Sequence, residues 1–301
     1  MGEPTATTFA DVARFLSAES TDPTVVEGVS TASNPRPRTL SFVTRWDSQA
    51  EDVVRRNPAT LFVVPLEAPP ATNVVPVPNP RLGFALAARE FLAAVSEATI
   101  APTAEIADTA EIAEGVSIGA FTVVEDGVTI GAGTSIDSHV VLKSGTRVGR
   151  EVRIGSHTAI GGPGFGFEVD DAGVPIRLAH LGGVVIGDHV EIGAQVSIAQ
   201  GTIEPTRIED HVKIDDCVFI AHNAVIGEAS FVIAGAEISG SVRIGKRAWI
   251  SPEASVINKA SIGDDALVGI GAVVVGDVEE NTVVAGVPAK PRGPRHTDKT
   301  R

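Results

Sequence analysis

Residues 208–226 read IEDHVKIDDCVFIAHNAVI, and an aliphatic side chain recurs at every sixth position of this stretch. The spacing continues downstream to Val274, and a second run with the same step extends from Ile106 to Ile160. This period matches neither an α-helix, with about 3.6 residues per turn, nor the simple alternation of a single strand. Self-similarity at a fixed short period predicts a solenoid of stacked units.

A six-residue step fits a three-sided coil in which each hexapeptide forms one flat wall. The aliphatic side chain then points into the prism, and the glycine that often follows it, as in Ile118-Gly119, is expected at a sharp corner. Three hexads make one coil, and coils stack about 4.8 Å apart as parallel strands do. Residues eighteen apart are therefore predicted to lie one above the other. The register is lost across 161–183, which predicts a loop, and an insertion near Thr202–Pro205 shifts it again.

The ends of the chain lack this repeat. In residues 1–100 we expect a small α/β domain, with helices at about 8–18 and 80–95 and strands near 39–45 and 59–65. The solenoid is predicted for 104–287. Residues 288–301, PAKPRGPRHTDKTR, carry five basic residues against one acid. They are predicted to form a flexible basic tail, with a docking patch for an acidic partner as the alternative.

The composition restricts the class of protein. The chain is 43% hydrophobic but has no Tyr, two Trp and eleven Phe, so its core must be built from Val, Ile, Leu and Ala. A net charge of −14 argues against nucleic-acid binding. We find no transmembrane-length apolar run and no signal peptide, and expect a soluble cytoplasmic protein. One cysteine, Cys217, excludes an internal disulfide framework and a Cys-based zinc site.

Histidines are the candidates for chemistry. Four of them occupy the fourth position of a hexad, outside the aliphatic slot, and are expected to be solvated: His139, His157, His189 and His211. His180 lies in the loop that interrupts the repeat, and His296 lies in the tail. No metal site is expected, because the closely spaced histidines of solenoid carbonic anhydrases have no counterpart around His222.

His222 directly follows the inserted segment, and Gly240 stands eighteen residues further on. Stacking would place the Gly240 N–H beside the imidazole. A base that removes the acceptor's proton and an N–H that stabilises a tetrahedral oxyanion are what acyl transfer to an amine or hydroxyl needs. The spacing alone fits a structural histidine equally well.

Three stretches carry a resemblance to a known family: GPGFGFEVDDAGVPIRLAHLGGVVIGDHVEIGAQVSIAQG (162–201), VKIDDCVFIAHNAVIG (212–227) and IAGAEISGS (233–241). They resemble the UDP-3-O-acylglucosamine N-acyltransferases, and the likeness extends weakly to TLSFVTRW (39–46) and NPRLGFALAA (79–88) in a uridine-binding-like domain. The resemblance implies a mainly β fold, a left-handed parallel β-helix of hexapeptide repeats behind a small α/β domain.

The same resemblance implies a homotrimer with sites between subunits. It also implies acyl transfer from the phosphopantetheine of acyl carrier protein to the amine of a UDP-sugar, with no bound cofactor. His222 would be the catalytic base and Gly240 the oxyanion amide, while Phe42 would stack on uracil. The expected substrate-binding residues are Phe42, Trp46, Phe165, Phe167, Asn223 and Lys259.

The chain also departs from the family's pattern. Lys259 replaces a second histidine, Pro163 replaces the Asp of the loop motif, and Arg45 and Ser48 replace an Asn and a Tyr after Phe42. The usual C-terminal helical extension is missing, and the ending VVAGVPAKP is similar to that of CoA-dependent sugar acetyltransferases.

Three hypotheses for the function follow. The first is an N-acyltransferase acting on a nucleotide-linked amino sugar, with a thioester of acyl carrier protein or CoA as donor. The second is a short-chain sugar O- or N-acetyltransferase that uses acetyl-CoA. The third is a non-catalytic trimeric scaffold that binds sugars.

Overall fold

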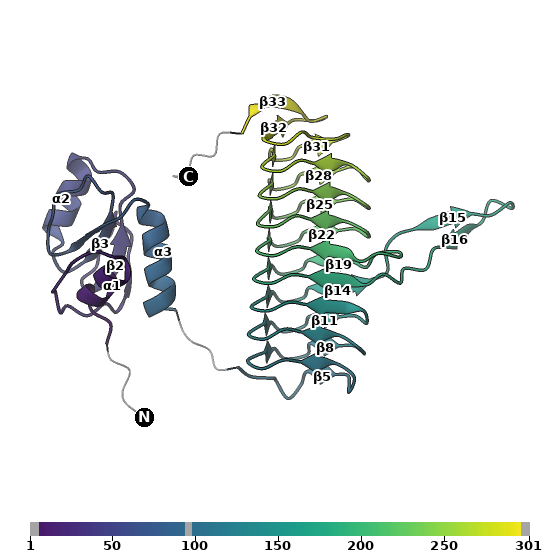
Figure 1. The fold of residues 1–301 in the computed structure, drawn as a ribbon, viewed down its shortest axis with the longest axis horizontal. Helices are drawn as coiled ribbons and strands as arrows, with labels where there is room; N and C mark the ends of the chain where they lie inside the picture. Colours follow the sequence, from purple (N-terminus) through teal and green to yellow (C-terminus); the bar gives the residue numbers. More distant parts are fainter. Residues whose placement is uncertain (1–5, 94–97, 296–301) are drawn as a thin grey trace. The chain divides into compact units, whose positions relative to one another are not determined.

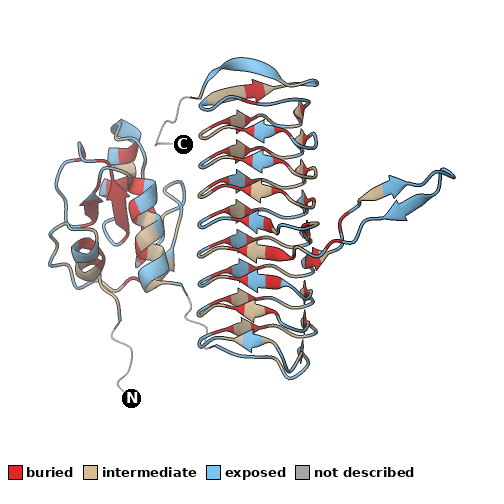
Figure 2. Cartoon of the chain, turned by 45° about the vertical axis from the view of Figure 1, so that its right-hand side comes forward, coloured by how far each residue is buried: buried red, intermediate tan, exposed pale blue. Residues whose placement is uncertain are grey.

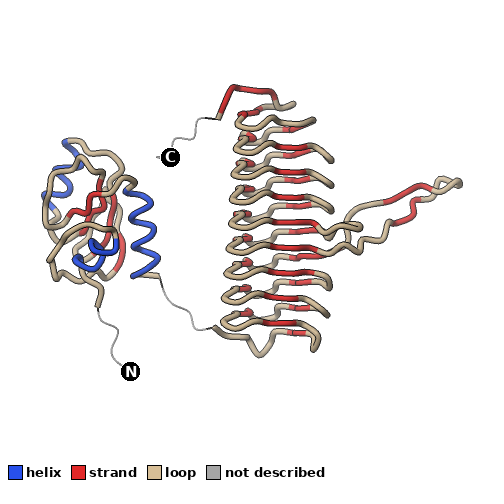
Figure 3. Tube along the Cα trace, in the orientation of Figure 1, coloured by secondary structure: helices blue, strands red, loops and turns tan. Residues whose placement is uncertain are grey.

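The computed structural model describes residues 6–93 and 98–295, and the chain divides into two compact units near residue 96 (Figure 1). All three helices of the described residues lie in the N-terminal unit, whereas strands and turns build the other (Figure 3). The longest helix has 12 residues, and none in the described part of the chain is long and apolar enough to cross a membrane.

The N-terminal unit is a four-stranded parallel sheet, in the order β1-β2-β3-β4, with three helices. Its elements are α1 (Phe9–Phe15), β1 (Gly28–Val29), β2 (Thr39–Phe42), α2 (Ser48–Arg56), β3 (Leu61–Val64), β4 (Val74–Pro76) and α3 (Pro80–Phe91). The expected helices and strands are present as α1, α3, β2 and β3. Each helix starts at a polar N-cap, and Thr8 forms a reciprocal capping box with Asp11. The sequence reading missed α2, which starts at the N-cap Asp47.

Three sheets form the walls of the solenoid, and the two largest contain ten and nine strands; their strands are parallel except for β33, the last strand of the first wall. The first wall contains β7 (Ser117–Ile118), β10 (Ser135–Ile136), β13 (Arg153–Ile154), β18 (Glu191–Ile192), β21 (Lys213–Ile214), β24 (Phe231–Val232), β27 (Trp249–Ile250), β30 (Leu267–Val268), β32 (Thr282–Ala285) and β33 (Lys290–Pro294). The second contains β5 (Glu105–Ile106), β8 (Val123–Val124), β11 (Val141–Leu142), β14 (Ala159–Gly162), β19 (Ser197–Ala199), β22 (Phe219–Ile220), β25 (Glu237–Ile238), β28 (Ser255–Val256) and β31 (Val273–Val274). The third contains β6 (Glu111–Ile112), β9 (Thr129–Ile130), β12 (Thr146–Val148), β17 (Val184–Ile186), β20 (Thr206–Ile208), β23 (Val225–Ile226), β26 (Arg243–Ile244) and β29 (Ser261–Ile262).

The register between coils is the predicted one. Ile136 pairs with Ile154, and Ile220 pairs with Ile238, so residues eighteen apart do stack. The repeating aliphatic side chains form one continuous core cluster in the solenoid. Buried residues recur along its stacked coils (Figure 2). This confirms the parallel β-helix read from the period.

A second inward position, two residues before each aliphatic, was not anticipated. It is filled by Val, Ala, Ser or Thr, and the threonines there are fully buried. Most of their hydroxyls bond to backbone groups: Thr122 Oγ1 donates to Asp137 O at 2.7 Å and accepts from Val140 N at 3.1 Å. The exception is Thr146, whose hydroxyl has no partner among the described residues. A buried hydroxyl with both partners avoids the desolvation penalty of an unpaired one.

The corners of the prism also differ from the expectation. The left-handed backbone lies three residues after the aliphatic, as at His139 (φ 62°) and Cys217 (φ 60°), rather than at the glycine that follows it. Glycine is required after the aliphatic for a different reason, which is the close approach of the next coil. A Cβ on Gly227 would lie 2.5 Å from the carbonyl carbon of Gly245. Histidines at the corners are exposed and stack in pairs, His139 on His157 and His189 on His211.

Two segments interrupt the coils. Residues 161–183 leave the second wall and form an antiparallel hairpin of β15 (Phe167–Val169) and β16 (Pro175–Arg177), which projects from the solenoid (Figure 1). The shorter insertion, residues 200–205, lies against the returning end of this loop, where Leu181 N donates to Thr202 O at 2.9 Å.

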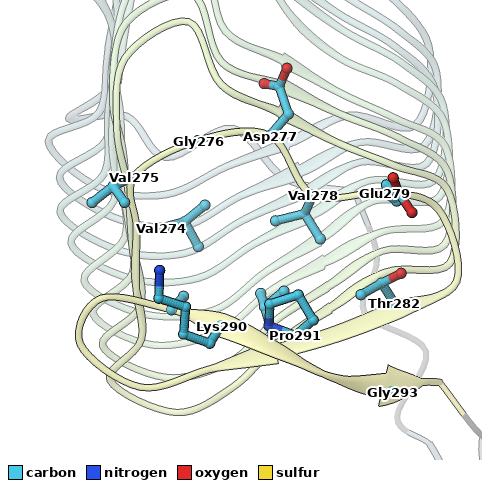
Figure 4. Close-up of a pocket in the computed structure, with 12 residues that line it drawn as sticks. Val274, Val275, Gly276, Asp277, Val278, Glu279, Thr282, Lys290, Pro291 and Gly293 are labelled. Carbon is cyan, nitrogen blue, oxygen red and sulfur yellow. The ribbon is translucent and has the colours of Figure 1, made fainter.

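The solenoid ends in a pair of strands rather than a loose tail. β33 runs antiparallel to β32, so residues 290–294 of the segment expected to be flexible form a strand. A cavity of about 530 Å³ opens at this end, lined by the aliphatic Val274 and Val278 with Lys290 at its edge (Figure 4). The remainder of the expected tail, residues 296–301 with His296, lies outside the described residues.

Candidate active site

The second wall turns at His222 and Asn223 after β22, and one coil further on it turns at Gly240 and Ser241 after β25. Ser241 N donates to His222 O at 2.9 Å, which holds the two turns together. A Cβ on Gly240 would lie 2.9 Å from His222 Nε2 and 3.0 Å from its Cε1. The predicted juxtaposition of these two residues is therefore present, and the imidazole leaves no room for a side chain at position 240.

The backbone N–H of Gly240 differs from several of its counterparts in other coils. At the same position, two residues after the aliphatic, acidic side chains accept the N–H of Arg150, Ala194 and Lys246, each at 2.7 or 2.8 Å. The Gly240 N–H makes no such bond to any residue that the structure describes. It is thus a free donor beside an imidazole nitrogen.

Asn223 is held by the inserted segment 200–205. Thr202 donates to Asn223 Oδ1 through its backbone N at 3.2 Å and its hydroxyl at 2.9 Å, and Asn223 Nδ2 donates to Glu204 O at 3.2 Å. These backbone partners fix which end of the amide is oxygen, because an N–H can only donate and a carbonyl can only accept.

The orientation of this amide determines the tautomer of His222. His222 Nδ1 lies 2.9 Å from Asn223 Oδ1, which is an acceptor, so Nδ1 carries the hydrogen and donates it. In the neutral ring the lone pair is then on Nε2, beside Gly240. The half-buried imidazole therefore presents its basic nitrogen next to the free N–H.

Loop 161–183 adds His180, which was not among the predicted site residues. His180 is 6% exposed and packs edge-on against His222, with ring centroids 5.0 Å apart and planes at 66°. A Cβ on Gly164 would lie 2.6 Å from His180 Nε2 and 2.8 Å from His222 Cδ2, so this glycine occupies the gap between the rings. The hexad register is lost across this loop, so the sequence could not predict the contact between His180 and His222.

The other expected substrate-binding residues of the solenoid unit are only partly brought together. Lys259 is exposed one coil beyond, and its backbone N donates to Gly240 O at 2.9 Å. Phe165 is 84% exposed and packs against Phe167, which also carries the Arg177 guanidinium 4.5 Å from its ring centre.

The N-terminal unit has its own pocket of about 750 Å³, lined by residues 29–34, Arg36, Phe42 and Phe84. The rings of Phe42 and Phe84 lie 4.9 Å apart. Trp46, which was expected to join Phe42, instead packs in a separate cluster around Val54 and Phe62.

The chain is similar to curated UDP-3-O-acylglucosamine N-acyltransferases, as the sequence resemblance predicted. It is 34% identical over 128 residues to that of Delftia acidovorans, covering 42% of this chain and 38% of the relative. To that of Bordetella avium it is 38% identical over 131 residues, covering 42% and 36%. The chain thus spans well under half of the length of these relatives. No protein-family model matches it.

Solved structures share the fold of the solenoid. The UDP-N-acetylglucosamine acyltransferase of Francisella novicida superposes with a TM-score of 0.61 at 27% identity, covering 65% of this chain and 71% of its own. The UDP-N-acetylglucosamine O-acyltransferase of Moraxella catarrhalis gives 0.60 at 29% identity, covering 65% and 74%. These neighbours are left-handed β-helix acyltransferases, so the predicted fold class is confirmed, including its hand.

Proposed function

We propose that the protein is an acyltransferase that moves an acyl group from a phosphopantetheine thioester to the amine of a nucleotide-linked amino sugar. The observation that carries this proposal is the pairing of the His222 Nε2 lone pair with the unbonded Gly240 N–H. The similarity to N-acyltransferases of UDP-3-O-acylglucosamine supports the choice of amine and nucleotide.

The geometry supports a direct transfer. The sugar amine attacks the thioester carbonyl carbon while His222 Nε2 takes a proton from the nitrogen. The Gly240 N–H stabilises the oxyanion of the tetrahedral intermediate. When the C–S bond breaks, the thiolate receives that proton from His222, leaving an amide and a free thiol. The bond from His222 Nδ1 to Asn223 keeps the ring in the tautomer that this sequence requires.

The nucleotide has a candidate pocket in the N-terminal unit. Phe42 and Phe84 offer aromatic faces on which a base could stack, and Arg36 supplies a positive charge for phosphate. We further propose a homotrimer with acyl carrier protein as the donor, because the resemblance implies both. Phe165, Phe167 and Lys259 would then contact the acyl chain or the sugar.

A second candidate is acetyl transfer from CoA. It is favoured by the end of the solenoid, where the sequence VVAGVPAKP forms β32, a turn and the beginning of β33. The same imidazole and N–H would serve this reaction. The two candidates therefore differ in the donor, not in the site.

The decisive assay combines each donor with each acceptor. Acyl carrier protein thioesters and acetyl-CoA would be incubated with UDP- and dTDP-linked amino sugars, and thiol release would be measured. A thermal-shift screen would record which of these ligands bind. We expect turnover with a UDP-amino sugar and a carrier-protein thioester. Turnover with acetyl-CoA alone would favour the second candidate, and sugar binding without turnover on any pair would favour a non-catalytic scaffold.

A further inference from the structure

The proposed reaction leaves a charge on His222 without a counter-ion. As Nε2 takes the proton, the ring becomes an imidazolium, and its Nδ1–H is bonded to the neutral amide of Asn223. In the described residues, no carboxylate hydrogen-bonds to His222. Serine-hydrolase triads solve the same problem with an aspartate. A neutral dipole near the ring would have to take this part here.

His180 has the properties of such a dipole. Its Nδ1 lies 3.0 Å from Leu178 O, an acceptor, so Nδ1 carries the hydrogen and the lone pair of the neutral ring is on Nε2. That Nε2 is buried and has no hydrogen-bond partner among the described residues. An unpaired polar atom in a buried position is unfavourable by itself and calls for a functional reason.

The unpaired nitrogen lies close to the contact between the two histidines, and both border Gly164. The point that a Gly164 Cβ would occupy is 2.6 Å from His180 Nε2 and 2.8 Å from His222 Cδ2. Gly166 also borders the His180 ring, at 3.1 Å from Cε1 by the same measure. The negative end of the His180 dipole is therefore separated from the His222 ring by little more than the backbone of a glycine.

We propose that His180 is a positioning residue that acts through His222. It holds the ring edge-on and directs its lone pair towards the imidazolium that forms during acyl transfer. The buried setting strengthens this interaction, because a low dielectric screens charge and dipole poorly. This inference rests on the proposed function, since His222 becomes charged only if it acts as the base.

Two substitutions separate the lone pair from the shape of the ring. His180→Phe keeps an aromatic ring and removes the acceptor, whereas His180→Gln removes the ring and keeps an oxygen that can accept. We expect the Phe variant to lose about tenfold in kcat with KM unchanged, as befits one lost electrostatic contact in a water-poor site. The Gln variant should stay within about threefold of the wild type. A purely structural role predicts the opposite order, with Phe at least as active as Gln.

A matched control uses His211, which is exposed and stacks on His189 at a corner away from the site. His211→Phe should leave kcat and KM unchanged, and circular dichroism would verify that all variants fold. If the wild type turns over and His180→Phe runs at the full rate, this inference is overturned alone. If the wild type has no turnover with any donor, the proposed function is overturned and the inference with it.

The tautomer can be measured independently of turnover and of any variant. The chain has seven histidines, which makes an ¹⁵N correlation spectrum of the imidazole rings assignable. We expect His180 to carry its hydrogen on Nδ1 in the neutral protein. A spectrum with the hydrogen on Nε2 would overturn the inference even if every variant folded poorly.

Discussion

The corner after β18 and the corner after β25 share one backbone geometry, but only at the first does the corner amide N–H have a hydrogen-bond acceptor. At the first, Ala194 N donates to the carboxylate of Asp216 at 2.7 Å, and the following Gln195 has a φ of 58°. At the second, the Gly240 N–H has no acceptor within the described residues, and the following Ser241 has a φ of 61°. The solenoid satisfies this amide with an acid at some corners and leaves it unbonded at others, such as Ser138 and Ser156; the unbonded amide of Gly240 is distinguished by the His222 imidazole beside it. The comparison identifies the site by the combination of an unbonded amide with a neighbouring imidazole.

The largest effect is expected at His222, the proposed general base. His222→Ala should reduce turnover by about 10²–10⁴-fold, the usual contribution of a general base. The fold should remain, because the core of the coil is formed by the aliphatic side chains and His222 is only half-buried. Thiol release and a melting curve would measure both. A near-wild-type rate with an active donor would exclude His222 as the base.

The next effect is expected at the glycine of the same corner. Gly240→Ala places a methyl group 2.9 Å from His222 Nε2, so the ring or the turn must shift. We expect kcat to fall by about 10²–10³-fold, because the shifted imidazole and amide no longer act together on the reacting carbonyl, an effect as large as the loss of an oxyanion donor. The control is Gly276→Ala, since a Cβ there meets nothing within 4 Å. Equal kinetics in the two variants would show that crowding at His222 does not matter.

A smaller loss is expected from the amide that orients the ring. Asn223 has a φ of 61°, so glycine is the substitution that removes its side chain without backbone strain. Asn223→Gly should lower kcat by about tenfold, because His222 loses the partner of its Nδ1–H. Ser241→Gly tests the same change one coil further on, where φ is also 61°. A larger loss of kcat in Ser241→Gly than in Asn223→Gly would contradict the role of Asn223 in orienting His222.

The smallest effect on the protein is expected at a corner whose amide N–H is bonded to a carboxylate. Asp188 accepts the Arg150 N–H at 2.8 Å, and its side-chain bond to the Arg150 guanidinium lowers the pKa of Asp188. Asp188→Ala should reduce the free energy of unfolding by about 1 kcal/mol at neutral pH and leave kcat unchanged.

The pH dependence of that difference has a definite sign. A carboxyl whose folded pKa is lowered stabilises the fold above its unfolded pKa, about 3.9, and this contribution is lost as the pH falls through the folded pKa. The gap in stability between wild type and Asp188→Ala should therefore narrow below about pH 4. Denaturant titrations at neutral and acidic pH would measure it, and a gap that widens in acid would contradict the role of the carboxylate.

The sequence was sufficient for the solenoid because one physical requirement, an apolar side chain facing the prism, repeats at a fixed step. The same step placed Gly240 beside His222. It could not reveal the second inward slot, because that slot is shared by apolar residues and by polar ones such as Thr122, whose burial depends on its backbone partners.

Other features depend on contacts that a period does not encode. His180 reaches His222 through a loop without register, and its placement follows from packing against Gly164. Trp46 lies near Phe42 in sequence but packs in a different cluster. The acids that accept corner N–H groups could have been predicted from the sequence, since Asp188 and Asp264 each follow an Ile-Gly pair at the corner.

The most direct test of whether the Gly240 N–H is unbonded is native-state amide hydrogen exchange, resolved by residue. The Ala194 and Lys246 N–H groups, which donate to Asp216 and Asp264, should exchange slowly, because their bonds must open first. The Gly240 N–H should exchange much faster under the same conditions. Equal protection at the three amides would mean that Gly240 is already bonded, and the proposed oxyanion donor would not exist.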